Sequence, residues 1–153
     1  MKTRNLCIAG LISLLFVLAC NDEDEISAPI VGVWAGNTAD FKVNPDGIIP
    51  AFSVTEDNFP VKLEFRNDGS LILTDDSQAS TTGTYEMSGR NLTINIDYEF
   101  EFIGLSGTYN VEELTNTKLR ASIEKEGNYE HPDTGQNFDG SVEATLFFDR
   151  QAD

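Results

Sequence analysis

The chain has 153 residues, and its 26 acidic and 10 basic side chains give a formal net charge of −16 at pH 7. A surface of this charge repels phosphate backbones, so we expect no nucleic-acid partner. The sequence also contains no phosphate-binding glycine loop and no dinucleotide fingerprint, so no nucleotide cofactor is expected.

Residues 1–19 have the pattern of a secretory signal peptide. Lys2 and Arg4 precede an apolar run from Leu6 to Ala19. As a helix this run would be roughly 21 Å long at ~1.5 Å per residue. A bilayer core is ~30 Å thick, so the run is too short for a stable span. A short apolar run behind basic residues is typical of a cleaved secretory signal.

The end of this run, Val17-Leu18-Ala19-Cys20, resembles the lipobox of bacterial lipoproteins. The resemblance implies cleavage before Cys20, a diacylglycerol on its thiol, and a fatty acid such as palmitate on the new amine. Each buried CH₂ contributes ~0.8 kcal/mol, so several acyl chains would anchor the protein almost irreversibly. Cleavage would remove Cys7 and two basic residues, leaving a charge of −18 and a single, lipidated cysteine. Disulfides, cysteine catalysis and thiolate metal sites are thereby excluded.

Residues 20–29 are expected to form a flexible tether. The run Asn21-Asp22-Glu23-Asp24-Glu25 has no apolar residue that could join a core, and Pro29 ends the segment. The run resembles the acidic export signal of surface lipoproteins in Bacteroidota. That resemblance implies an outer-membrane lipoprotein exposed on the cell surface. The alternative is an outer-membrane lipoprotein that faces the periplasm.

Residues 30–153 are predicted to form one all-β domain. Apolar and polar residues alternate in four stretches, at 61–66, 92–102, 119–124 and 142–148. A period of two with one apolar face indicates half-buried strands, and we expect the stretch from 92 to 102 to be one long strand. No window has a convincing helical period.

Turn residues separate these stretches. Asn67-Asp68-Gly69 and Ser88-Gly89-Arg90-Asn91 predict tight hairpins, because Gly supplies the positive φ that such turns need. A further hairpin is predicted at 114–119, a strand end at 104–107, and a long polar loop at 127–140. Residues 36–58 are irregular, and we expect a strand with an inserted loop that covers one mouth of a barrel.

About eight to nine strands at short spacing favour an antiparallel up-and-down meander. Closing the meander into a barrel would remove its exposed edges. A β-sandwich is the alternative fold.

Several segments in order resemble bacterial lipocalin-like lipoproteins, which have calycin-type barrels. They are Gly32-Val33-Trp34 in the first strand and the segments 63–70, 83–94, 109–119 and 145–150. The resemblance implies that Trp34 plugs one end of the barrel and that Arg150 packs over it. It also implies a small apolar ligand as partner. The sequence departs from classical lipocalins because it lacks a C-terminal helix and a disulfide.

The ligand hypothesis depends on aromatic side chains that point into the barrel. The predicted wall residues are Phe65, Tyr85, Tyr98, Phe100 and Tyr109. The alternative function is an accessory lipoprotein with a filled barrel, which acts through its surface and loops on a partner such as an outer-membrane protein. Phe147 and Phe148 are adjacent and must point in opposite directions. An exposed apolar face there would favour this alternative.

The sequence offers no convincing catalytic residue. His131 is the only histidine, no nucleophile elbow accompanies it, and we expect it to lie exposed in a loop. Asp133-Thr134-Gly135 matches the aspartic-protease tripeptide, but that chemistry needs two such carboxylates. Asp133, Asn137 and Asp139 could supply oxygens to calcium, although their spacing does not fit an EF-hand. We therefore predict a protein that is not an enzyme and has no metal site.

Overall fold

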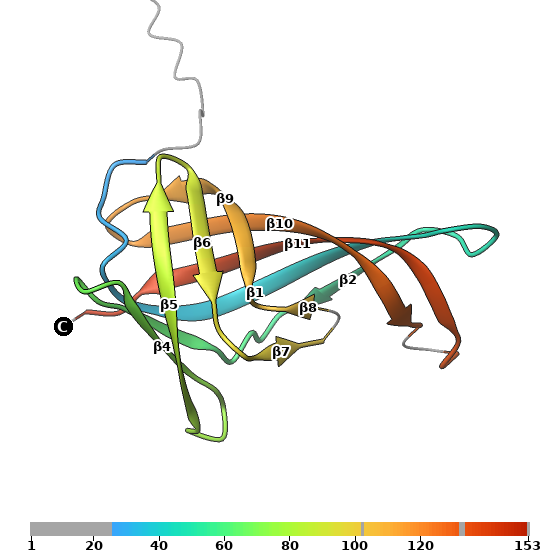
Figure 1. The fold of residues 1–153 in the computed structure, drawn as a ribbon, viewed down its shortest axis with the longest axis horizontal. Helices are drawn as coiled ribbons and strands as arrows, with labels where there is room; N and C mark the ends of the chain where they lie inside the picture. Colours follow the sequence, from blue (N-terminus) through green and yellow to red (C-terminus); the bar gives the residue numbers. More distant parts are fainter. Residues whose placement is uncertain (1–25, 102, 132–133, 153) are drawn as a thin grey trace, which may run out of the picture.

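The computed structural model describes residues 26–101, 103–131 and 134–152 (Figure 1). The predictions for the signal peptide, for Cys20 and for the acidic run lie outside these residues. The described residues form strands and no helix, and so none of them belongs to a helix that could cross a membrane. The strands are β1 (Gly32–Pro45), β2 (Phe52–Glu56), β3 (Lys62–Phe65), β4 (Ser70–Thr74), β5 (Ser80–Ser88), β6 (Asn91–Asn95), β7 (Glu99–Phe100), β8 (Ile103–Gly104), β9 (Gly107–Leu114), β10 (Lys118–Glu130) and β11 (Asn137–Arg150).

The strands form an antiparallel meander that closes into a barrel. Their order in the sheet is β11-β10-β9-β6-β5-β4-β3-β1-β2, and β11 pairs back onto β1 from Trp34–Arg150 to Pro45–Gly140. Eight strands complete the barrel, and β2 is an extra strand beside β1. The predicted all-β barrel is confirmed. The sandwich alternative is wrong, because the β1–β11 pairing joins the two ends of the sheet.

The core is the inside of this barrel, and it follows from the period of two. Leu71 and Leu73 in β4 and Leu92 in β6 are almost completely buried, and their immediate neighbours along each strand face outward. Burying one such side chain stabilises the fold by ~1.5–3 kcal/mol. The predicted hairpins at 67–69 and 88–91 are confirmed, with φ of 81° at Gly69 and 58° at Gly89.

A close approach of two strands explains one further glycine. A Cβ on Gly83 in β5 would lie 2.4 Å from the carbonyl oxygen of Asn95 and 2.8 Å from Cβ of Ile96. Any side chain there would force β5 away from the end of β6.

Three strands of the barrel are long enough to continue beyond it. Residues 39–43 of β1 pair with β2 on one side and β11 on the other, and β11 pairs with β10 as far as Glu130. The extended parts of β1, β10 and β11, together with β2, form a four-stranded extension that we call the arm. It consists of residues 40–45, 52–56, 123–130 and 137–143. Figure 1 shows that the arm extends along the long axis, away from the barrel end where the described chain begins.

The arm overturns two expectations. The predicted loop at 127–140 is mostly strand, and only residues 131–136 connect β10 to β11. Its mostly polar sequence also contains Tyr129 and Phe138, which pack on each other with ring centroids 6.0 Å apart. The ring centroids of Phe138 and Phe52 are 6.2 Å apart. The irregular segment at 36–58 forms the β1–β2 hairpin, which lengthens the sheet instead of inserting a loop over a mouth.

The predicted long strand from 92 to 102 is also wrong. β6 ends at Asn95, and the Ser106 hydroxyl then bonds the backbone N–H and carbonyl of Ile96 at 2.8 and 2.5 Å. The chain leaves the barrel sheet there and forms the small β7–β8 hairpin. Phe100 of this hairpin packs against Phe59, with ring centroids 4.7 Å apart, where the barrel meets the arm.

Candidate functional site

One barrel end is filled by Trp34 and Arg150, which the structure brings together. The Trp34 side chain is completely buried, and its indole N–H donates to the Ile30 carbonyl at 2.7 Å. The Arg150 guanidinium carbon lies 4.4 Å from the centre of the indole ring, and the same group donates to the Pro29 carbonyl. Gly32, at φ 138°, leaves the space that Arg150 occupies, because a Cβ there would lie 3.3 Å from Nη1. Trp34 and Arg150 therefore pack on each other near the paired ends of β1 and β11.

The barrel interior is filled by side chains. A cavity inside it has a volume of about 10 Å³ and is lined by apolar side chains that include Phe65 and Tyr109. Ligand pockets are typically ~300–1,000 Å³, and ~10–15 Å³ is the least that holds one water. The buried Tyr109 hydroxyl donates to the Leu105 carbonyl at 2.9 Å, and burial raises the pKa of this phenol.

The other three predicted wall residues do not line that interior. Tyr85 is half-buried, its ring contacts Phe65 at 4.8 Å, and its hydroxyl donates to the Arg66 carbonyl at 2.7 Å. Tyr98 lies between β6 and β7, and Phe100 lies in β7 against Phe59. The five aromatic residues therefore do not surround one pocket.

Two of the three candidate calcium ligands lie in a strand of the arm. Asp133 lies outside the described residues, whereas Asn137 and Asp139 belong to β11. One Asp139 oxygen accepts from the Asn128 amide at 3.0 Å. Over the described part of the chain, no group of three or more His, Cys, Asp or Glu residues could hold a metal ion.

His131 is half-buried and not exposed as expected. Its ring centroid lies 4.7 Å from that of Phe52 in β2. Its backbone also bonds Gly135 and Gln136 in the connection to β11, at 2.9 Å each. The histidine therefore packs against the aromatic side chains of the arm.

The outer face of β11 carries an open groove of about 370 Å³. Phe148 points into the barrel and is buried, so Phe147 points outward and lines this groove. Some of the polar residues that line it are bound to one another. Lys118 and Asn37 bind the Asp149 carboxylate.

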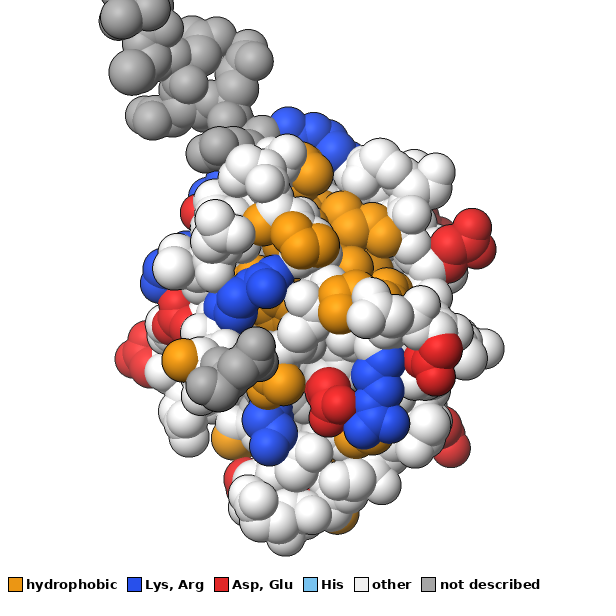
Figure 2. All heavy atoms as spheres, turned by 90° about the vertical axis from the view of Figure 1, so that its left-hand side faces the viewer, with side chains coloured by type: hydrophobic (Ala, Val, Ile, Leu, Met, Phe, Trp, Pro, Cys, Tyr) orange, Lys and Arg blue, Asp and Glu red, His pale blue; other side chains and the backbone are white. Residues whose placement is uncertain are grey.

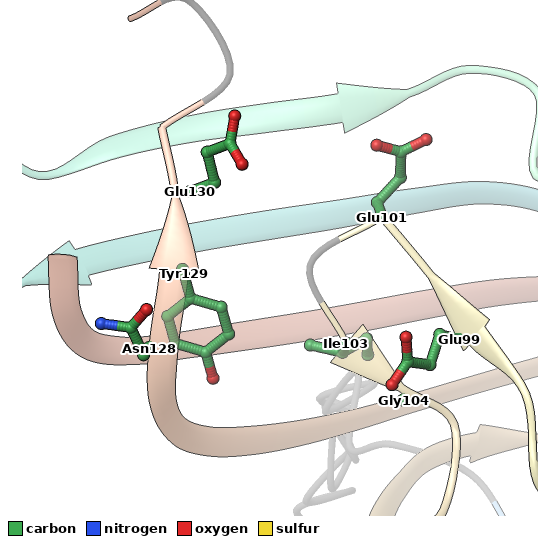
Figure 3. A pocket seen from close by; sticks show the side chains of 7 residues that line it. All are labelled: Glu99, Glu101, Ile103, Gly104, Asn128, Tyr129 and Glu130. Atoms are coloured by element: carbon green, nitrogen blue, oxygen red, sulfur yellow. The ribbon is translucent and has the colours of Figure 1, made fainter. Parts of the chain in front are cut away.

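A second groove, of about 410 Å³, lies between the β7–β8 hairpin and the last residues of β10. We call it the arm groove. Figure 3 shows Glu99, Glu101, Ile103 and Gly104 on the hairpin side and Asn128, Tyr129 and Glu130 on the β10 side.

Lys125 ties the two walls of the arm groove together. Its ammonium group donates to the carbonyls of Gly104 and Ser106 at 2.6 and 2.5 Å. Partial burial lowers the pKa of this amine. The Tyr129 ring folds back along β10, and its hydroxyl donates to the Lys125 carbonyl at 2.9 Å. Gly127 permits this, because a Cβ there would lie 3.2 Å from the Tyr129 ring.

The sequence did not single out the residues of the arm groove. Carboxylates occur throughout so acidic a chain, so Glu99, Glu101 and Glu130 carried no signal. Tyr129 fell inside a predicted loop.

The architecture is a closed antiparallel barrel of eight strands with one added strand, which is compatible with a lipocalin-like barrel. No protein-family model, curated protein or solved structure matches this chain.

Proposed function

We propose that this protein is a lipid-anchored accessory protein of the bacterial cell envelope, and that it acts by binding another protein through its surface. The observation that carries this proposal is the barrel interior, where the cavity has a volume of only about 10 Å³. A filled barrel serves as a rigid scaffold, and recognition then falls to the outer grooves and the arm. No catalytic chemistry is proposed for it.

The beginning of the described chain supports an orientation for the anchored protein. Ile26 bridges to Leu114 at the end of β9, and the Ser27 N–H donates to the Leu114 carbonyl at 2.8 Å. A lipid on Cys20 would be linked through residues 20–25, which reach at most ~20 Å at ~3.3–3.6 Å per residue. The membrane would then lie beside this barrel end, and the arm would point away from it.

The face at this barrel end fits a position near lipid headgroups. Figure 2 shows an area of hydrophobic side chains on this face, with both basic and acidic side chains around it. The apolar area supports the same orientation as the path of the chain, whereas the mixed charges around it favour no particular headgroup.

Native mass spectrometry of the protein purified from its own host tests the filled-barrel proposal. We expect the mass of the processed, acylated chain and no bound small molecule. An apolar compound bound at a ratio of one to one would overturn the proposal. It would support instead the small apolar ligand that the lipocalin resemblance implies. A denatured sample supplies the control mass.

The anchor is tested by Cys20→Ala. We expect labelled palmitate to be incorporated into the parent and not into the variant, and the variant to leave the membrane fraction. An unlabelled parent would refute the lipoprotein assignment. Protease added to intact cells then distinguishes display on the cell surface, implied by the Bacteroidota-like export signal, from a periplasmic orientation.

A further inference from the structure

β10 has an open edge in the arm. β9 pairs with β10 only between Leu119 and Ser122, and no other described strand pairs with that edge beyond Ser122. The opposite edge of β10 is fully paired with β11 as far as Glu130. Along the arm groove, residues 123–130 therefore present backbone groups that no described strand pairs, and among them the Lys125 carbonyl accepts from the Tyr129 hydroxyl. An open edge of this kind is a template for an added strand.

We propose that this edge takes up an extended, positively charged segment of a partner protein. The segment pairs with β10 as an added strand and places a Lys or Arg side chain in the arm groove. The inference rests on the proposed protein-binding function and names its surface and the chemistry of its partner.

The walls of the arm groove suit such a side chain. The carboxylates of Glu99, Glu101 and Glu130 line it, all three residues are exposed, and no ion pair within the described residues reaches them. Tyr129 offers an aromatic ring for the aliphatic stem and the cation, and the buried Ile103 lies at the wall of the groove.

Charge decides which occupant fits the edge. Within the four segments of the arm, two basic residues stand against seven acidic ones. The basic residues are Lys42 and Lys125, and the acidic residues are Asp40, Glu56, Glu124, Glu126, Glu130, Asp139 and Glu143. Lys42 pairs with Glu143 at 3.1 Å, and Lys125 is bound to two carbonyls. The arm thus carries an excess of negative charge that no group of its own neutralises.

The same excess disfavours other occupants. A second copy of the chain would bring the edge that carries Glu124, Glu126 and Glu130 against the same acidic edge, and like charges that face each other destabilise a strand pair. The acidic run at 21–25 of the chain itself would be repelled for the same reason. A basic, extended segment pairs with the backbone and with these carboxylates together.

A synthetic peptide tests the inference. The full chain, purified in non-ionic detergent, is titrated against a fluorescent peptide of about ten residues in which Lys alternates with Val, the pattern of a strand. Fluorescence anisotropy should show saturable binding. The same peptide with N-methyl groups on all its backbone amides can donate from neither edge and cannot complete a strand pair, so its binding should be lost. Hydrogen exchange should slow at residues 123–130 only with the unmethylated peptide.

Two matched triple variants separate the arm groove from general charge attraction. The triple variant Glu99→Gln, Glu101→Gln and Glu130→Gln should weaken binding about tenfold, the combined effect of three partly exposed charge pairs. The triple variant Asp57→Asn, Asp76→Asn and Glu86→Gln removes the same charge from exposed residues that do not line the groove. Its effect should be less than about twofold.

Three outcomes would overturn the inference: equal binding of the methylated peptide, equal weakening by the two triple variants, or no binding at millimolar peptide. None of them changes the result of native mass spectrometry. The arm can therefore fail as the docking surface while the proposed protein-binding function stands.

Discussion

Removing the Arg150 charge should destabilise the barrel measurably. Arg150→Met keeps much of the aliphatic packing but removes the cation that lies 4.4 Å from the Trp34 ring centre. A cation–π contact contributes ~0.5–2 kcal/mol. The hydrogen bond from the charged group to the Pro29 carbonyl contributes ~1.5–3 kcal/mol. Because Arg150 is only half-buried, we take the lower part of both ranges and expect a loss of about 2–3 kcal/mol in the free energy of unfolding.

Urea unfolding followed by tryptophan fluorescence measures this loss directly. Trp34 is the only tryptophan in the chain, so the signal comes from the site itself. The midpoint should fall without a change in the m-value, because the surface exposed on unfolding is unchanged. Arg150→Lys keeps the charge and should lose less, and Arg66→Met, at an exposed arginine, should have little effect. A loss below about 0.5 kcal/mol for Arg150→Met, typical of an ordinary surface position, would refute the plug.

Three further substitutions test the packing and the pH dependence. Gly83→Ala should lower stability by ~1–3 kcal/mol through its clash with β6, and an unchanged melting temperature would contradict this. Hydrogen bonds from Lys118 and then Asn37 hold the pKa of Asp149 below its ordinary 3.8. The stabilisation from these two hydrogen bonds is therefore complete above pH 3.8 and is lost as the pH falls further. Asp149→Asn should be less stable than the parent at neutral pH, and the two stabilities should converge in acid. Parallel curves of stability against pH would count against the contribution of these hydrogen bonds. Burial raises the pKa of Tyr109 above 10.0, so its contribution is complete below pH 10 and lost at higher pH. Tyr109→Phe should flatten the alkaline limb of the stability curve, and an equally steep limb would exclude Tyr109 as its cause.

The barrel could be predicted from the sequence because its two strongest signals are local. Alternation fixed which residues of β6 and β11 face inward, and the glycines at 69 and 89 marked the hairpins. The pairing of Trp34 with Arg150 could also be predicted. The two residues lie near the ends of the first and last strands and face each other once the barrel closes.

The arm and its groove could not be predicted in the same way. Residues 127–130 are mostly polar and resemble a loop. They become a strand because Tyr129 packs on Phe138, which in turn packs on Phe52, a residue remote in sequence. Conversely, alternation continues through residues 96–102, yet the chain turns away because Ser106 bonds the backbone of Ile96. In both places a contact outside the segment's own local pattern determines the backbone.

Strand length explains why a closed barrel still has an open edge. β1, β10 and β11 have 14, 13 and 14 residues, whereas β3 and β4 have 4 and 5. The excess cannot be paired by the short strands of the barrel. β2 covers β1 in the arm, and on the other side the edge of β10 carries Glu124, Glu126 and Glu130.

Charge of either sign protects such an edge from self-pairing, so the sign itself can be tested. Changing Glu124, Glu126 and Glu130 to Lys retains like-charge repulsion between copies but reverses the attraction to a basic strand. We expect this variant to remain monomeric in light scattering and no longer to bind the peptide in which Lys alternates with Val. Changing the same residues to Gln should instead allow concentration-dependent self-association, because the protecting charge is gone. If the Lys variant bound the basic peptide as well as the parent does, the carboxylates of β10 would serve only as protection, and the edge would have no preference for a basic partner.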